Sequence, residues 1–183
     1  MDYGAKFASG LPYGDFLTRY GSVGDRRRWD DFHARVSLSD SQQQLLKSFV
    51  REMQVLVMAG TWCGDCVNQC PIFDHFAQAT DRIQLRFFDR DDNPDLATAL
   101  QTCGAPRVPA VVFLSEDGKF CGRAGDRTLA KYRQMASSLT GAACSTGIHD
   151  SLTDAVVQEW LDEFERIQWM LRTSGRLRQL HGD

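Results

Sequence analysis

Between residues 39 and 139, short apolar runs rich in β-branched residues alternate with helical patterns. Such runs are typical of buried strands, and a helix between two of them indicates a crossover connection. The last two runs are joined by SEDGK (115–119), whose Asp-Gly pair predicts a hairpin. We therefore predict an α/β fold with a central mixed β-sheet flanked by helices. The expected strands are 55–60, 83–88, 108–114 and 120–124.

Start and stop signals place several helices around these strands. Ser39, with Gln42 three residues on, predicts the start of a helix by the capping-box pattern. Pro71 should kink a later helix, because its ring opposes the carbonyl of Val67. Asp126 is expected to cap the helix that follows the hairpin.

Chain length favours one well-buried domain over two, so we predict a single domain spanning 1–183. Residues 39–143 form its core, and 1–38 form a helical N-terminal extension that lacks a convincing strand. Residues 150–175 form an amphipathic C-terminal helix. The polar tail RLRQLHGD is expected to fray.

Charge and hydropathy exclude several classes of protein. The 24 acidic and 21 basic residues give a net charge of −3 and are mixed along the chain, so we expect no nucleic-acid partner. No stretch reaches the ~20 apolar residues of a membrane span, so we expect no membrane partner. The N-terminus lacks the pattern of a secretory signal, and we expect a cytoplasmic location with reduced thiols.

Three of the six cysteines lie in TWCGDCVNQC (61–70), directly after an expected strand. Cys63 then stands at the start of a helix, where unpaired N–H groups and the positive end of the helix dipole favour a thiolate. Cys66 lies one turn further on, within bridging distance. The spacing indicates thiol–disulfide exchange, in which Cys63 attacks a substrate disulfide and Cys66 resolves the mixed disulfide.

With features further along the chain, this motif resembles the thioredoxin family over roughly residues 40–140. The combined order of these features is far more specific than a lone Cys-x-x-Cys pair. They are Trp62-Cys63-Gly64-Asp65-Cys66, Pro71, residues 89–94, Val108-Pro109-Ala110, Gly104 and Gly125.

The resemblance implies a thioredoxin-like fold and a protein-disulfide reductase or related oxidoreductase. It also implies that Pro109 forms a cis peptide bond facing the dithiol, that Val108 offers backbone hydrogen bonds to an extended substrate, and that Trp62 shields the site. The redox centre would be the Cys63–Cys66 disulfide itself, so we expect neither a bound cofactor nor a metal.

Three positions depart from the family pattern. Val57 stands where many thioredoxins carry a buried acid, and Phe87 stands at the position of a nearby lysine, so a built-in base for the second cysteine is missing. Asp65 replaces the usual proline. Its carboxylate should make Cys63 less acidic by like-charge repulsion, and we also consider it as a proton relay to Cys66. The residues expected to tune the pair are Trp62, Gly64 and Asp65.

The remaining cysteines and the histidines leave alternatives open. Cys70, four residues after Cys66, is either a buried core residue, which we favour, or a second resolving thiol or metal ligand. A metal-handling protein would use Cys66 and Cys70 together with Cys63. However, the sequence has no second closely spaced pair of ligands that would complete a zinc site. The others belong to no motif: Cys103, Cys121, Cys144, His33, His75, His149 and His181.

The expected partners are disulfide-containing protein substrates and an unidentified reductase or thiol donor. The rival hypothesis is a non-catalytic binding scaffold whose cysteines are vestigial. Aromatic faces in the added helices, Trp29 with Phe32 and Trp160 with Phe164, need burial. They pack either against the core of the same chain, which we favour, or against a partner or a second copy of the chain.

Overall fold

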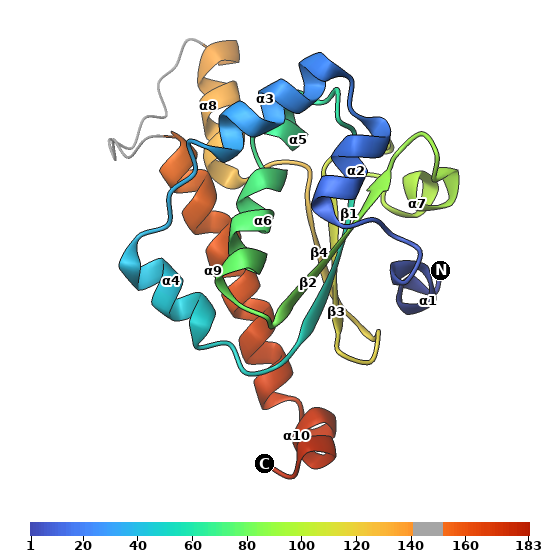
Figure 1. The fold of residues 1–183 in the computed structure, drawn as a ribbon, viewed down its shortest axis with the longest axis vertical. Helices are drawn as coiled ribbons and strands as arrows, with labels where there is room; N and C mark the ends of the chain where they lie inside the picture. Colours follow the sequence, from blue (N-terminus) through green and yellow to red (C-terminus); the bar gives the residue numbers. More distant parts are fainter. Residues whose placement is uncertain (141–151) are drawn as a thin grey trace.

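The computed structural model describes residues 1–140 and 152–183. Its centre is a four-stranded sheet in the order β2-β1-β3-β4 (Figure 1). Strand β1 pairs parallel with β2 and antiparallel with β3, which pairs antiparallel with β4. This arrangement confirms the predicted mixed sheet. The strands are β1 (Met53–Ala59), β2 (Ile83–Asp89), β3 (Ala110–Ser115) and β4 (Phe120–Gly125).

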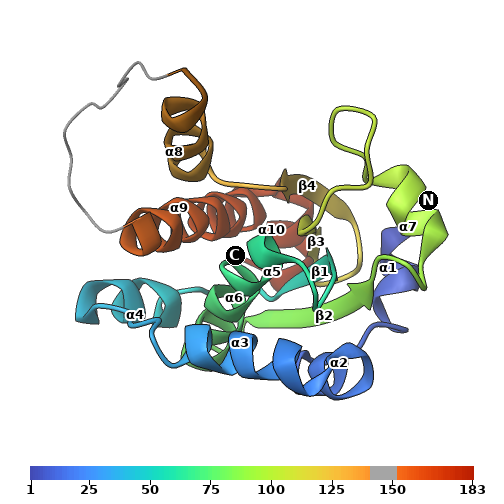
Figure 2. The same ribbon diagram turned by 90° about the horizontal axis from the view of Figure 1, so that it is seen from above.

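Helices cover both faces of this sheet. Helices α6 and α9 lie on one side, whereas α1 and α7 lie on the other, and α2 runs beside β2 (Figures 1 and 2). The helices are α1 (Tyr3–Phe7), α2 (Tyr13–Tyr20), α3 (Val23–His33), α4 (Asp40–Lys47), α5 (Gly64–Val67), α6 (Cys70–Ala79), α7 (Pro94–Ala99), α8 (Leu129–Thr140), α9 (Leu152–Thr173) and α10 (Gly175–His181).

The aromatic faces of the added helices are buried in the chain's own core. Phe164 of α9 packs edge-on against Phe76 of α6 and Phe113 of β3, with ring centroids 5.2 and 5.1 Å apart. Trp29 of α3 is fully buried, and Trp160 of α9 is almost so. The apolar stripes seen in the sequence are therefore covered without a second copy of the chain.

Three predicted details of the helices are wrong. Instead of kinking one helix, Pro71 lies in the first turn of a separate helix, α6, where its missing N–H costs nothing. Asp126 does not cap α8, because that helix begins at Leu129 and the N–H of Ala130 donates to the Glu159 carboxylate of α9, at 3.0 Å.

The tail, expected to fray, instead forms helix α10, which Ser174 caps by accepting from the N–H of Leu177. The C-terminal helix predicted over 150–175 corresponds to α9, which ends at Thr173.

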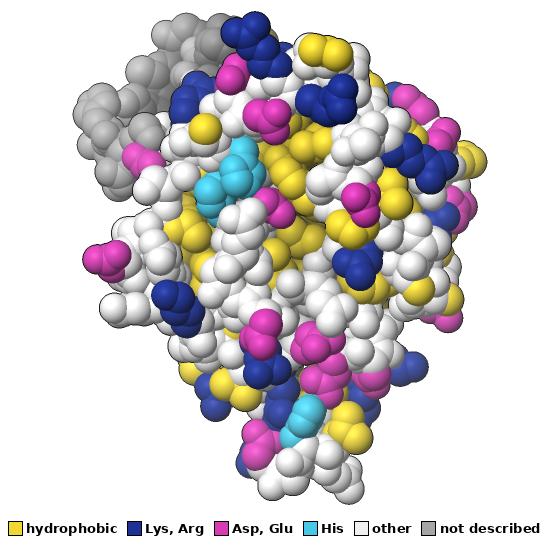
Figure 3. Space-filling view, in the orientation of Figure 1, with side chains coloured by type: hydrophobic (Ala, Val, Ile, Leu, Met, Phe, Trp, Pro, Cys, Tyr) yellow, Lys and Arg dark blue, Asp and Glu magenta, His cyan; other side chains and the backbone are white. Residues whose placement is uncertain are grey.

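The N-terminal segment pairs with a strand of the sheet at Leu11. Leu11 forms an isolated antiparallel bridge to Phe87 of β2, with N–H to carbonyl distances of 3.0 and 2.7 Å. The described part of residues 1–38 has no longer strand, in agreement with the sequence analysis. On the surface, acidic and basic side chains are intermixed over the face shown in Figure 3. None of the helices in the described ranges is long and apolar enough to cross a membrane.

Candidate active site

Strand β1 ends shortly before the cysteine motif, so the motif lies at one end of the sheet. After the strand, Cys63 is the N-cap residue of the four-residue helix α5, and its carbonyl accepts from the N–H of Val67 at 3.0 Å. Cys63 is half-buried and Cys66 is fully buried. Cys63 thus stands at a helix start, and Cys66 lies one turn further along the chain, as the sequence predicted.

The loop before β3 lies opposite the motif. The Val108–Pro109 peptide bond is cis, as the family resemblance implied. The Cys63 thiol donates to the carbonyl oxygen of Val108, with a sulfur–oxygen distance of 3.6 Å. The structure therefore brings Cys63 together with the adjacent residues Val108 and Pro109, which lie far from it in the sequence.

Both thiols of the motif have raised pKa values. For Cys66 the main cause is burial, which disfavours the charged form. For Cys63 the hydrogen bond with Cys66 raises the pKa most and partial burial adds to it, whereas the backbone N–H groups of Cys66 and Asp65 oppose the shift. The raised pKa of Cys63 agrees with our expectation that this thiol is less acidic. Its causes, however, are the neighbouring thiol and burial and not the carboxylate of Asp65.

The Asp65 carboxylate forms an ion pair that the sequence analysis missed. It lies 2.6 Å from Nη2 of Arg127, whose Nη1 donates to Asp126 at 3.0 Å. The Asp126 carboxylate is buried and also accepts from the hydroxyl of Tyr132 and, at 3.4 Å, from Nη1 of Arg107. Burial pushes the pKa of Asp126 up, but these donors outweigh it and hold the pKa below its usual range.

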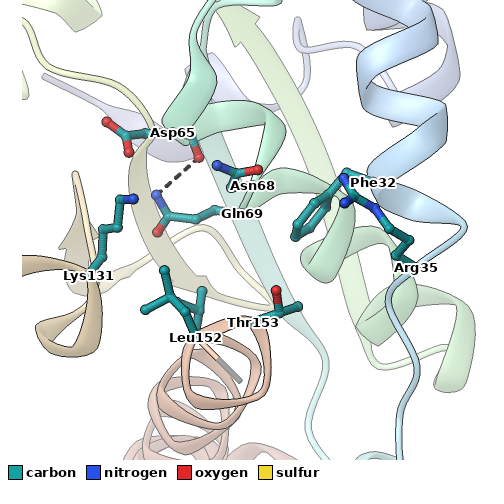
Figure 4. Close-up of a pocket in the computed structure, with 9 residues that line it drawn as sticks. Phe32, Arg35, Asp65, Asn68, Gln69, Lys131, Leu152 and Thr153 are labelled. Atoms are coloured by element: carbon teal, nitrogen blue, oxygen red, sulfur yellow. Dashed lines mark hydrogen bonds between the residues drawn. The ribbon is translucent and has the colours of Figure 1, made fainter. Parts of the chain in front are cut away.

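Gln69, a second residue that the sequence analysis did not single out, ties the motif to the rest of the protein. Its buried amide donates to the backbone carbonyl of Asp65 at 3.1 Å (Figure 4). It also donates to the backbone carbonyl of Asp126 at 2.9 Å. Its own carbonyl accepts from the Trp160 indole of α9 at 2.9 Å. Gln69 also lines a pocket of about 180 Å³ beside α5, with the Asp65 carboxylate on the same side as Lys131 (Figure 4).

Trp62 lies exposed beside the cysteines, with 47% of its surface accessible. The guanidinium of Arg90 stacks over its ring at 4.5 Å. Two donors from α3 hold the backbone before the motif: the Trp29 indole binds the carbonyl of Thr61 at 2.8 Å, and Arg28 binds the carbonyl of Trp62 at 3.3 Å. The N-terminal helices are therefore part of the site's support.

The other predicted tuning residue, Gly64, is the first residue of α5. A Cβ at this position would meet no atom within 4 Å, so the surrounding space does not require glycine. Two of the three departures from the family pattern, Val57 and Phe87, are buried in the core.

Cys70 is fully buried at the start of α6, as expected for a core residue. Across the described ranges, no three His, Cys, Asp or Glu side chains are grouped to hold a metal ion. His33 of α3 binds Asp74 of α6 at 2.9 Å and stacks on His75, so these two histidines join helices. Elsewhere, Cys103 is exposed, Cys121 is half-buried, His181 binds Glu116, and Cys144 and His149 lie outside the described residues.

Comparison with solved structures identifies the fold. A protein of unknown function from Pseudomonas aeruginosa matches with a TM-score of 0.73 and 17% identity, over 91% of this chain and 96% of that one. An HIV epitope-scaffold matches with a TM-score of 0.68 and 18% identity, over 91% and 97%. Thioredoxin from Fasciola hepatica matches less closely, with a TM-score of 0.37 and 23% identity over 52% and 88%.

No curated protein matches the chain in sequence. The profile of the family described as thioredoxin, however, matches residues 10–138. That range contains the cysteine motif, the cis-proline loop and all four strands. The chain therefore belongs to the thioredoxin family.

Proposed function

We propose that this protein is a thiol–disulfide oxidoreductase that reduces disulfides in protein or small-molecule substrates. The observation that carries the proposal is the placement of the Cys63 sulfur at the start of α5, 3.6 Å from the carbonyl oxygen of Val108. An extended substrate strand bound along Val108 would bring its disulfide to the half-buried thiol, beside the exposed ring of Trp62.

The exchange takes place in two displacements. The Cys63 thiolate attacks one sulfur of the substrate disulfide, that bond breaks, and the departing sulfur takes a proton from solvent. Cys66, on losing its proton, then attacks the sulfur of Cys63 and releases the second substrate thiol. The substrate gains two electrons and two protons, while the protein is left with a Cys63–Cys66 disulfide. A reductase or a small thiol must return these electrons.

Reduction of insulin by dithiothreitol, with catalytic amounts of the protein, tests the proposal. We expect the wild type to accelerate the reaction and Cys63→Ser to lose all acceleration. Cys66→Ser should instead accumulate a mixed disulfide on Cys63, detectable by mass spectrometry, because no second thiol resolves it. Cys70→Ala is the matched control and should keep most of the activity, since Cys70 is a buried thiol outside the two displacements.

The same assay separates catalysis from the scaffold alternative. Equal rates for the wild type and Cys63→Ser would refute the oxidoreductase proposal and favour a binding role for the fold.

A further inference from the structure

We propose that Arg127 is a positioning residue for this redox site, which holds and neutralises the carboxylate of Asp65 so that its charge does not oppose thiolate formation at Cys63. The inference rests on the proposed function of the Cys63–Cys66 pair. It assigns Asp65 a different role from the proton relay considered from the sequence.

The geometry of the pair supports this role. Asp65 is the second residue of α5, and its carboxylate lies 2.6 Å from Nη2 of Arg127. Both side chains are mostly buried, with 18% and 17% of their surfaces accessible, so solvent screens the pair only weakly. The contact directs the Asp65 carboxylate toward the guanidinium of Arg127.

Arg127 is itself held in place from a second side. Its Nη1 donates to the buried carboxylate of Asp126 at 3.0 Å, so the planar guanidinium bridges two acids. Burial lowers the pKa of Arg127, but Asp65 and Asp126 outweigh this effect and raise it, so the group stays charged. The bridge joins the first turn of α5 to the loop between β4 and α8.

Charged groups of both signs surround the bridge. Arg107 lies 3.4 Å from Asp126, so two carboxylates face two guanidinium groups. Tyr132 donates to Asp126, and Lys131 lines the pocket that also includes Asp65. Facing Cys63 is the thiol of Cys66, which in turn contacts Cys70. Removing one member of the bridge therefore changes the net charge next to the motif.

The test is the pH dependence of Cys63 alkylation by iodoacetamide, followed by mass spectrometry of the Cys63 peptide. Arg127→Gln should move the midpoint to higher pH, because Asp65 is left uncompensated. We expect a thiolate fraction at pH 7 roughly threefold to tenfold lower than in the wild type. Asp65→Asn should move the midpoint to lower pH, because the positive charge of Arg127 remains after the carboxylate is removed. Arg127→Lys should stay closer to the wild type than Arg127→Gln.

The opposite directions separate electrostatics from structural loosening. If Asp65→Asn and Arg127→Gln shifted the midpoint in the same direction, or not at all, the inference would be overturned. Should Arg127→Gln fail to fold because Asp126 stays buried, Asp65→Asn and Arg127→Lys still decide the question. Arg176→Gln is the matched control: it removes an Arg–Asp pair at 2.5 Å far from the motif and should leave the midpoint unchanged.

Alkylation does not depend on disulfide exchange. A wild type that fails to reduce insulin would refute the proposed function, while the alkylation midpoints would still report on Arg127 and Asp65.

Discussion

At the scale of single residues, Gly125 sets how closely two parts of the site approach. It has a φ of +100°, and a Cβ at this position would stand 2.3 Å from the carbonyl oxygen of Pro109. We expect Gly125→Ala to lower the free energy of unfolding by at least about 2 kcal/mol, because it adds backbone strain to a steric clash. Urea unfolding followed by circular dichroism measures the loss.

Gly104→Ala is the control for backbone strain alone. Gly104 also has a positive φ, +73°, but a Cβ there would meet no atom within 4 Å. Gly104→Ala should lower the free energy of unfolding by about 1 kcal/mol, the ordinary cost of a left-handed conformation for alanine. Equal losses of unfolding free energy in Gly125→Ala and Gly104→Ala would mean that the steric clash with the Pro109 loop does not contribute to the destabilisation.

How far the site could be predicted differed from residue to residue. Cys63 and Cys66 carry a local signal, since their spacing after a buried strand is enough to place both at a helix start. Pro109 was found only through the family resemblance. The ion pair of Asp65 with Arg127 had no signal in the sequence, because it depends on how the loop after β4 folds back over α5.

At the scale of secondary-structure elements, α3 supports the backbone that leads into the motif. The indole N–H of the fully buried Trp29 donates to the carbonyl of Thr61 at 2.8 Å. Trp29→Phe keeps an aromatic ring but leaves that carbonyl without this donor. We expect a loss of about 1–3 kcal/mol in unfolding free energy, together with slower insulin reduction.

Trp169→Phe provides the comparison for this substitution. Trp169 of α9 is half exposed, and its indole binds Glu165 on the same helix at 3.0 Å, where water can replace the partner. Its unfolding free energy should change by less than about 0.5 kcal/mol. If Trp29→Phe were equally neutral in stability and activity, α3 would have no part in supporting the motif.

The contribution of α3 also explains a limit of the sequence analysis. An amphipathic stripe tells which side of a helix is buried, but not which element it packs against. Residues 1–38 were therefore described as an extension, whereas α2 and α3 contact β2 and the motif (Figure 2). The mixed character of the sheet was predictable, because crossovers and a hairpin restrict the ways in which strands pair.

At the scale of the whole molecule, both ends of the chain meet the turn between β3 and β4. The backbone of Gly4 in α1 packs directly against Gly118 of that turn. From the other end, Arg176 of α10 binds Asp117 at 2.5 and 3.1 Å, and His181 binds Glu116. The turn thus joins two terminal helices to the sheet at the end remote from the cysteines.

These ion pairs make the fold sensitive to acid. The hydrogen bonds from Arg176 and Ser115 lower the pKa of Asp117 to about 2, and ion pairs or caps also lower the pKa values of Asp25, Asp95 and Asp183. A carboxyl group whose pKa is lower in the folded state stabilises the fold above its unfolded pKa, and this stability is lost as the pH falls through the folded value. We therefore expect the thermal midpoint to fall between about pH 4 and pH 2.

Asp117→Asn tests whether the turn contributes to this loss. The variant should have a lower thermal midpoint than the wild type at pH 7, because the pair with Arg176 is missing. Its midpoint should then fall less steeply between about pH 4 and pH 2, since one titrating group has been removed. Asp81→Asn is the control, because Asp81 is exposed and pairs with its neighbour Arg82. An acid slope in Asp117→Asn as steep as in the wild type would show that the contacts of Asp117 do not hold α10 against the sheet.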